Sequence, residues 1–244
     1  MAAIAAVREL RSTTAPTAFA GTGADVLVGG RTSENIDYID SAIDPATIVI
    51  ALVLGLTLIL LTTVFRSLVV AAVTVLLNLL SVGAAYGLIV LVFQQGVGAG
   101  LFGFQQSDTI EAWVPLFLFS VLFGLSMDYQ VFVLSRIKER YDEVGDTTNA
   151  VTYGVASTAR IITGAALIII IVFTGFARGE LIMFQQMGFG VAVALLIDAT
   201  IVRSVLLPSM MHLLGRWNWY LPRWLTWLPR LQIEAPRAAS TESG

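Results

Sequence analysis

The sequence contains no cysteine and only one histidine, His212, among its 244 residues. Without cysteine there can be no disulfide and no thiolate metal site, and a lone histidine does not build a zinc site. We therefore expect no bound metal and no cofactor. The scarcity of these residues, together with the lack of a paired-carboxylate constellation, makes a membrane enzyme the least favoured class of function.

Charged residues are also scarce. They make up 13% of the sequence while hydrophobic residues make up 57%, whereas soluble domains carry about 25% charged residues. A soluble fold of this size could not bury so much apolar surface, so the sequence indicates a protein surrounded by lipid. The net charge of −3 and the lack of a basic domain argue against nucleic acid as a partner.

Five apolar stretches have the length of about 20 residues that a spanning helix needs. Arg66, the segment 94–111 and the charged loop 136–146 separate these stretches along the chain. We expect an all-α membrane protein, a bundle of five transmembrane helices within residues 46–208. The expected spans are 46–65, 67–93, 113–135, 158–177 and 181–207.

The basic residues predict the orientation of the bundle. Lysine and arginine occur at Arg66, in the segment 136–160 and from Arg203 onward, whereas the two other connections contain only Arg178. Cytoplasmic loops carry the excess of basic residues. We therefore expect a multi-pass protein of the cell membrane with its C-terminus in the cytoplasm.

The first 45 residues carry no basic-then-apolar signal peptide. Because five spans would place this polar segment outside the cell, we expect the chain to be the end of a longer protein. Residues 1–45 would then be the remnant of an extracytoplasmic domain. Residues 26–30 are typical of a short strand leading into a glycine turn, and 32–44 predict a helix or turn, with Pro45 at the membrane edge.

The segment 209–235 predicts an interfacial tail. Three units that open with arginine and close with proline follow one another, and tryptophan and tyrosine crowd the first two. Prolines at this spacing prevent one long helix, while aromatic and arginine side chains favour the inner headgroup layer. Residues 236–244 have the composition of a disordered C-terminus. The three units are 216–222, 223–229 and 230–236.

Asp128 is the most informative residue of the sequence. It lies eight residues before Arg136, about 12 Å along a helix and inside the hydrocarbon layer. An acid at that depth costs several kcal/mol, which makes it a functional-site hypothesis. It either carries protons or pairs with another helix for stability. Gly124 and Phe132 share its helix face, and Phe132 is either an apolar gate against water or a plain packing residue.

Four segments resemble the MMPL family of the RND superfamily. They are 28–32 (VGGRT), 122–136 (LFGLSMDYQVFVLSR), 188–203 (GFGVAVALLIDATIVR) and 214–225 (LGRWNWYLPRWL), and they occur in the family's order. The resemblance implies the C-terminal transmembrane half of a proton-driven exporter of lipids or other lipophilic products. It assigns the proton relay of this half to Asp128 and Tyr129, facing a like pair on a missing N-terminal half or a complete homologue.

Asp198 and Arg203 are two further ionisable residues within an expected span. Five residues separate them, about 140° around an α-helix, so we expect them not to pair. We expect Asp198 to pair with Arg160 or Arg136, or else to take part in proton exit. Asn78 is expected to bond a neighbouring helix. Small-residue pairs at 83/87, 188/192 and 190/194 suggest close helix contacts.

Two alternatives to the exporter remain open. A non-transporting, sterol-sensing-like module would need no titrating acid at Asp128, and a nonfunctional truncated remnant would need no partner. Besides membrane lipids and a lipophilic substrate, a further copy of the chain in an oligomer is compatible with the sequence. The substrate itself is not specified, since the domains that would select it are not in the sequence.

Overall fold

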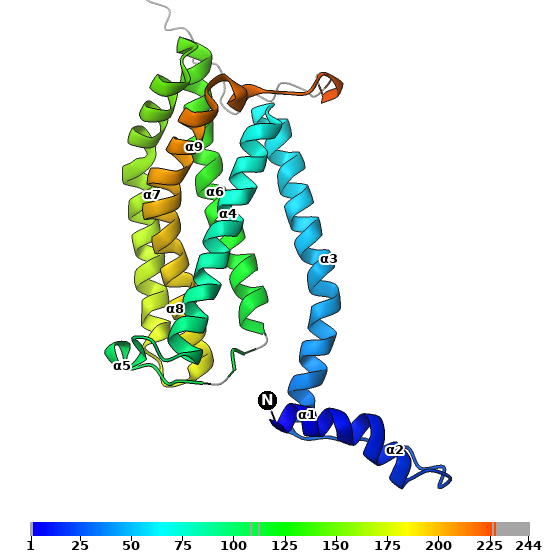
Figure 1. Ribbon diagram of the computed structural model, residues 1–244. Coiled ribbons are helices and arrows are strands. Elements are labelled where there is room, and N and C mark those ends of the chain that lie inside the picture. The colour runs from blue at the N-terminus through cyan, green and yellow to red at the C-terminus, as the bar shows by residue number, and fades with distance from the viewer. Residues whose placement is uncertain (1, 108, 112, 226, 228–244) are drawn as a thin grey trace, which may run out of the picture.

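The computed structural model describes residues 2–107, 109–111, 113–225 and 227, and all regular structure within them is helical (Figure 1). The helices before the bundle are α1 (Ala2–Glu9), η1 (Leu10–Thr14) and α2 (Ala15–Ala18). Those of the bundle are α3 (Arg31–Phe65), α4 (Leu68–Ile89), η2 (Val90–Gln94), α5 (Ala99–Phe102), α6 (Trp113–Val144), α7 (Thr147–Ala177), α8 (Ile182–Ile197), η3 (Asp198–Leu206) and α9 (Leu207–Leu214). The tail contains η4 (Gly215–Trp219) and η5 (Arg223–Leu225).

Five helices are long and apolar enough to cross a membrane, which confirms the all-α membrane fold. They are α3, α4 with η2, α6, α7 and the continuous run from α8 through η3 to η4. The prediction of a loop at 136–146 is wrong. Helix α6 continues to Val144, and α7 begins at Thr147. Ion pairs three or four residues apart stabilise this extension: Arg136–Glu139, Lys138–Asp142 and Arg140–Glu143.

Helix α3 is much longer than the expected span. Its 35 residues measure about 52 Å, against the roughly 30 Å of a hydrocarbon core. It passes through position 45 without a break, so that position is not an edge of the helix. The strand expected at 26–30 is wrong: this segment is irregular, Leu27 is 88% exposed, and the described residues offer no strand to pair with.

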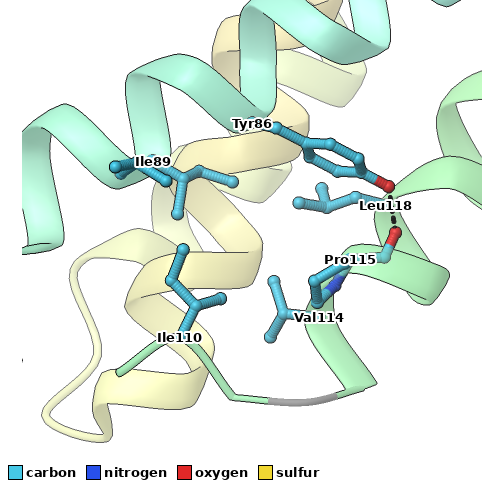
Figure 2. Close-up of a pocket in the computed structure, with 7 residues that line it drawn as sticks. Tyr86, Ile89, Ile110, Val114, Pro115 and Leu118 are labelled. Atoms are coloured by element: carbon cyan, nitrogen blue, oxygen red, sulfur yellow. Dashed lines mark hydrogen bonds between the residues drawn. The ribbon is translucent and has the colours of Figure 1, made fainter. Parts of the chain in front are cut away.

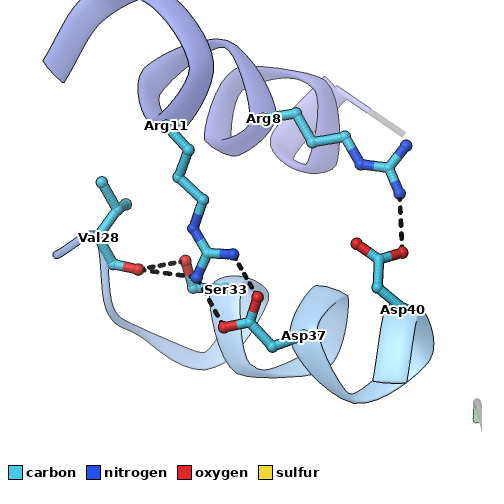
Figure 3. Close-up of polar contacts among 6 residues, drawn as sticks. All are labelled: Arg8, Arg11, Val28, Ser33, Asp37 and Asp40. Atoms are coloured by element: carbon cyan, nitrogen blue, oxygen red, sulfur yellow. Dashed lines mark hydrogen bonds and ion pairs between the residues drawn. The ribbon is translucent and has the colours of Figure 1, made fainter. Parts of the chain in front are cut away.

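The N-terminal helices are fastened to the start of α3 by polar contacts (Figure 3). Arg11 forms a bidentate ion pair with Asp37, in which Nη2 lies 2.8 Å from Oδ2. It also donates to the carbonyl of Val28. Ser33 donates to the same carbonyl, and Arg8 pairs with Asp40. Hydrogen bonding to Asp37 raises the pKa of Arg11 above its ordinary value. These contacts therefore hold the segment before the bundle to the start of α3.

Helices α6, α7 and α8 pack closely, and α4 packs against both α6 and α8 (Figure 1). Helix α3 meets α4 and α6 and diverges from them away from the α3–α4 turn. We call the end of the bundle that holds this turn, the α6–α7 turn and the tail the basic end, since Arg66, Lys138 and Arg216 lie there. The other end, with α5 and the α6 start, is the loop end.

The tail is packed against the basic end rather than free of it. Asn218 is buried and donates to the carbonyls of Met211 and Gly215, and its own carbonyl accepts a hydrogen bond from Ser67. The Trp219 ring stacks on Tyr141 at 4.4 Å between centroids. Two other tryptophan side chains of the tail, Trp217 and Trp227, are exposed. The third arginine–proline unit and residues 236–244 lie outside the described residues.

Two glycines of α8 leave room for neighbouring helices to approach closely. A Cβ at Gly188 of α8 would overlap the backbone of Phe173 and Ala177 on α7, and one at Gly190 would meet Ile89 and Leu118. The expectation of close contacts is therefore confirmed for these positions. It is wrong for the pair 83/87, because a Cβ there has no neighbour within 4 Å.

Replacing Gly188 by alanine tests this contact. The new methyl group has to displace the α7 backbone, so Gly188→Ala should destabilise the protein by about 1–3 kcal/mol, as overpacking does. Gly83→Ala is the matched control, since it adds the same group where there is space. The measurement is thermal unfolding in detergent. Equal losses for the two variants would contradict the contact.

Candidate functional site

A buried ion pair lies inside the bundle. Asp198 and Arg203 are 3% and 5% exposed, and Arg203 Nη2 lies 2.6 Å from Asp198 Oδ2. The expectation that Asp198 pairs with Arg160 or Arg136 is therefore wrong. Arg160 is exposed, and Arg136 pairs with Glu139 instead.

The helix type explains why two residues five apart are partners. They lie in η3, a π-helix of nine residues, in which backbone bonds join residues five apart rather than four. The amide of Leu207 donates to the carbonyl of Val202, five residues earlier. This wider turn brings residues five apart onto one face, so the angle of about 140° that holds for an α-helix does not apply here.

Further contacts join this pair to α6 and α4. Arg203 Nη2 donates to the carbonyl of Ser126 at 3.2 Å, and its guanidinium lies 5.3 Å from the centre of the Tyr129 ring. Ser126 Oγ is 2.9 Å from Asn78 Oδ1 and donates to it, as expected for an asparagine bonded to a neighbouring helix. We call Asn78, Ser126, Tyr129, Asp198 and Arg203 the buried polar cluster.

Asp128 lies on the opposite side of α6. It is exposed on the outer surface of the bundle, as are Gly124 and Phe132, the latter at 37%. Tyr129 is half-buried and faces Arg203. The two adjacent residues of the expected relay therefore point to different surroundings, one away from this bundle and one into it. Of the four predicted site residues, Tyr129 and Asp198 meet through Arg203, and Asp128 and Phe132 share the exposed face of α6.

The role of Arg203 and Ser126 could not be read from the sequence. Serine in an apolar run is usually a minor packing residue, and Ser126 carried no distinguishing signal. The Asp198–Arg203 spacing becomes informative only if a π-helix is assumed, and π-helices are rare, short features that occur often at functional sites. A nearby acid and base inside one apolar span were the usable signal, because such residues usually pair.

The structure also contains an apolar pocket between α4 and α6 near the loop end (Figure 2). Its volume is about 200 Å³, and it has no polar lining surface. The Tyr86 hydroxyl donates to the Pro115 carbonyl and is thereby satisfied. This pocket suits an apolar group rather than an ion or a proton. Its lining residues are Tyr86, Ile89, Val90, Ile110, Val114, Pro115 and Leu118.

Metal ligands do not gather anywhere in the described residues. No group of three or more His, Cys, Asp or Glu side chains lies close enough there to hold an ion, and His212 is exposed. The chemistry that this arrangement can support is proton binding and charge rearrangement by carboxylate, phenol and guanidinium groups.

The ion pair makes a testable contribution to stability. Arg203→Met should destabilise the protein by about 3–5 kcal/mol, because Asp198 is left buried without a counter-charge. Adding Asp198→Asn should restore most of that loss, since no charge then remains. Arg160→Met, at an exposed arginine, serves as the control in thermal unfolding. An Arg203→Met protein as stable as the wild type would contradict the buried pair.

Comparisons with known proteins agree with this architecture. The family model described as "MMPL family" matches residues 1–237. "Heme uptake protein MmpL11" of Mycobacterium tuberculosis (strain ATCC 25618 / H37Rv) is 45% identical over 216 residues, which cover 87% of this chain. "Mycolic acid-containing lipids exporter MmpL11" of Mycolicibacterium smegmatis is 43% identical over 220 residues, or 89% of the chain. "Trehalose monomycolate exporter MmpL3" of the same species is 36% identical over 203 residues, or 83% of the chain.

The chain spans less than a quarter of the length of these relatives, since the matches cover 22%, 23% and 20% of their sequences. The extensive match of the family model and the run of five apolar helices nevertheless lead to one assignment. This chain belongs to the MMPL family.

Proposed function

We propose that this chain is the C-terminal half of a proton-motive-force-driven exporter of lipids or lipophilic metabolites. Its part in the mechanism is one half of an intramembrane proton relay. The observation that carries this proposal is the placement of Asp128, which is an exposed carboxylate in the middle of α6 beside a tyrosine that contacts a buried ion pair.

Asp128 lies in the interior of the membrane by its position in the helix. It is 15 residues after Trp113 and 16 before Val144, the two ends of α6. A charged residue facing lipid at the helix centre costs about 2.5–3.5 kcal/mol on insertion scales. This cost favours a second helix bundle over the outer face of α6, and Gly124, one turn away, leaves room for a close approach. The missing N-terminal half is the partner that the family assignment supports.

Tyr129 connects the carboxylate to the rest of this half. Its ring contacts the guanidinium of Arg203, and Arg203 is held by Asp198 and by the Ser126 carbonyl. A change of charge at Asp128 would occur one residue from this contact, and charges in a low-dielectric interior interact strongly. If the two protonation states favour different helix arrangements, proton binding shifts the balance between them.

Phe132 and Asp198 complete the proposed path. Phe132 lies one turn from Asp128 toward the basic end on the same exposed face, where its ring would exclude water from the carboxylate. Asp198 is on the exit side, bonded to Arg203. The driving force is sufficient for such a device: one proton crossing 100 mV yields about 2.3 kcal/mol, and one pH unit adds about 1.4 kcal/mol.

A lipophilic substrate is the class that two observations support. Two of the compared relatives are named as exporters of mycolic acid-containing lipids and of trehalose monomycolate, and one is named for heme uptake. The pocket between α4 and α6 has an entirely apolar lining and is suited to part of a hydrocarbon chain (Figure 2). The direction of transport, the cell membrane location and a cytoplasmic C-terminus belong to this proposal.

The proposed orientation places the basic end in the cytoplasm. Because the protein has no cysteine, Gln106→Cys and Thr148→Cys each introduce one thiol, at the loop end and at the start of α7. A membrane-impermeant thiol reagent on intact cells should label only the Gln106→Cys variant, and both variants after the cells are opened. Labelling of Thr148→Cys alone on intact cells would reverse the orientation.

Asp128→Asn tests the relay. Asparagine keeps the size and the hydrogen-bonding shape but cannot titrate, so proton-driven export by the complete transporter should be abolished while membrane insertion is preserved. Tyr129→Phe keeps the ring over Arg203 and loses only the hydroxyl, so it should impair export less completely. The measurement is export under an imposed proton gradient, normalised to the amount of protein in the membrane.

Ser120→Ala is a suitable control for Asp128→Asn, because Ser120 lies two turns away on the same exposed face and its hydroxyl donates to the Leu116 carbonyl of its own helix. This variant should export normally. Wild-type export by Asp128→Asn would instead favour a non-transporting, sterol-sensing-like module or a purely structural acid. A chain that shows no transport with any complementary half would favour the truncated remnant.

A further inference from the structure

Several buried polar atoms near the cluster lack hydrogen-bond partners within the described part of the chain. They are Thr74 Oγ1 and Asn78 Nδ2 on α4, Gln130 Oε1 on α6, and Arg203 Nη1 on η3. Thr74, Asn78 and Gln130 are 0%, 1% and 2% exposed. Helix α4 packs against both α6 and η3, and Arg203 donates to the Ser126 carbonyl of α6, so the four atoms lie on neighbouring elements. Two more unpaired atoms, Thr62 Oγ1 and Trp219 Nε1, lie on α3 and in the tail.

The order of these atoms along the helices is regular. Asn78 and Ser126 are bonded to each other across the α4–α6 contact. Helix α4 starts at the basic end and α6 finishes there. Thr74 and Gln130 are therefore each four residues, or one helical turn, nearer the basic end than the bonded pair. Two antiparallel helices thus present matching polar residues one turn nearer the basic end than the hydrogen bond between Asn78 and Ser126.

Buried polar atoms are costly to leave without hydrogen bonds. A buried donor or acceptor without a partner costs about 1–3 kcal/mol, and lipid provides no hydrogen bonds to compensate for it. Apolar side chains of the same shape would remove the cost altogether. Buried water, which typically makes two to four hydrogen bonds, satisfies groups of this kind in protein interiors.

We propose that Thr74, Asn78 and Gln130 hold a file of water between α4 and α6, which leads from the Asp198–Arg203 pair toward the basic end. This inference rests on the proposed function, in which the file is the cytoplasmic branch of the proton path. None of the three side chains titrates at physiological pH, so they orient water rather than carry charge themselves. They are positioning residues for the relay.

The arrangement seen here is closed on the cytoplasmic side. Phe65, Val70 and Ile137 are buried in the apolar cluster of the basic end, at 1%, 3% and 0% exposure. Val70 and Ile137 lie beyond Thr74 and Gln130 along their own helices, toward that end. Water would reach the file when α3, α4 and α6 separate there, which couples access to helix movement.

Thiol accessibility tests the file without measuring transport. Thr74→Cys, Asn78→Cys and Gln130→Cys each place one thiol in a protein that has none, and silver ions probe it in native membranes with and without a proton gradient. The matched control is Leu77→Cys, at a position on α4 that is 4% exposed in the apolar cluster. File positions should react at least about tenfold faster, because the reactive thiolate forms only where water is present.

A second pair of variants separates water orientation from packing. Thr74→Val and Gln130→Leu remove the unpaired atoms and keep the shape, so the protein should be as stable as the wild type or more so. Export by the complete transporter should nevertheless fall by about tenfold or more, because the proton path is interrupted. Leu77→Val, which leaves the polar atoms in place, should export normally.

The outcomes distinguish the two proposals. Unreactive thiols under both conditions, or normal export by Thr74→Val and Gln130→Leu, would overturn the water file while leaving Asp128 as the relay. Reactive thiols and impaired export in the file variants support the file. Reactive thiols together with normal export by Asp128→Asn would contradict the proposed relay at Asp128, and with it the role of the water file as a proton path.

Discussion

The Asp198–Arg203 pair is the constraint on which the interior of this bundle depends. Two charges in an apolar environment are tolerated when they neutralise each other. That requirement is met through a π-helix, which brings residues five apart together. The same Nη2 of Arg203 also donates to the Ser126 carbonyl on α6, and the guanidinium lies over the Tyr129 ring. Asn78 on α4 follows through Ser126.

Helix α6 separates two surroundings. Tyr129 turns toward the buried pair, and the adjacent Asp128 turns away from the bundle. In an α-helix adjacent residues differ by about 100°, so neighbours in the sequence can serve two different interfaces. A carboxylate on the outer face is unfavourable for an isolated bundle in lipid, yet it suits one half of a larger assembly. The short coverage of the relatives, less than a quarter of each, is consistent with this reading.

Much of the fold followed from the sequence because long apolar runs allow few structures in a membrane. The apolar pattern predicts six of the ten span ends to within one turn, and it fails where polar or charged residues continue a helix. Residues 136–144 are charged yet helical, since their ion pairs lie on neighbouring turns. The prediction for the partner of Asp198 fails for a different reason. It depends on 3.6 residues per turn, and the local π-helical backbone does not follow that period.

The two ends of the α4–α6 contact differ in a way that gives the proposed path its direction. Toward the loop end, the buried residues of α6 are Val114, Leu118, Phe119, Leu122 and Phe123, and α4 adds Val82, Ala85 and Ile89. Ser81, the other buried residue of α4 in this half, donates to the Ala194 carbonyl on α8. The α4–α6 contact itself is therefore apolar here, and it contains the pocket. Toward the basic end, the same two helices bury Thr74, Asn78, Ser126 and Gln130. Water and protons avoid the first half and find hydrogen-bonding groups in the second. A proton delivered from the outer face of α6 to the buried cluster would therefore meet hydrogen-bonding groups between α4 and α6 only toward the basic end, as far as the apolar residues Val70 and Ile137 that close it.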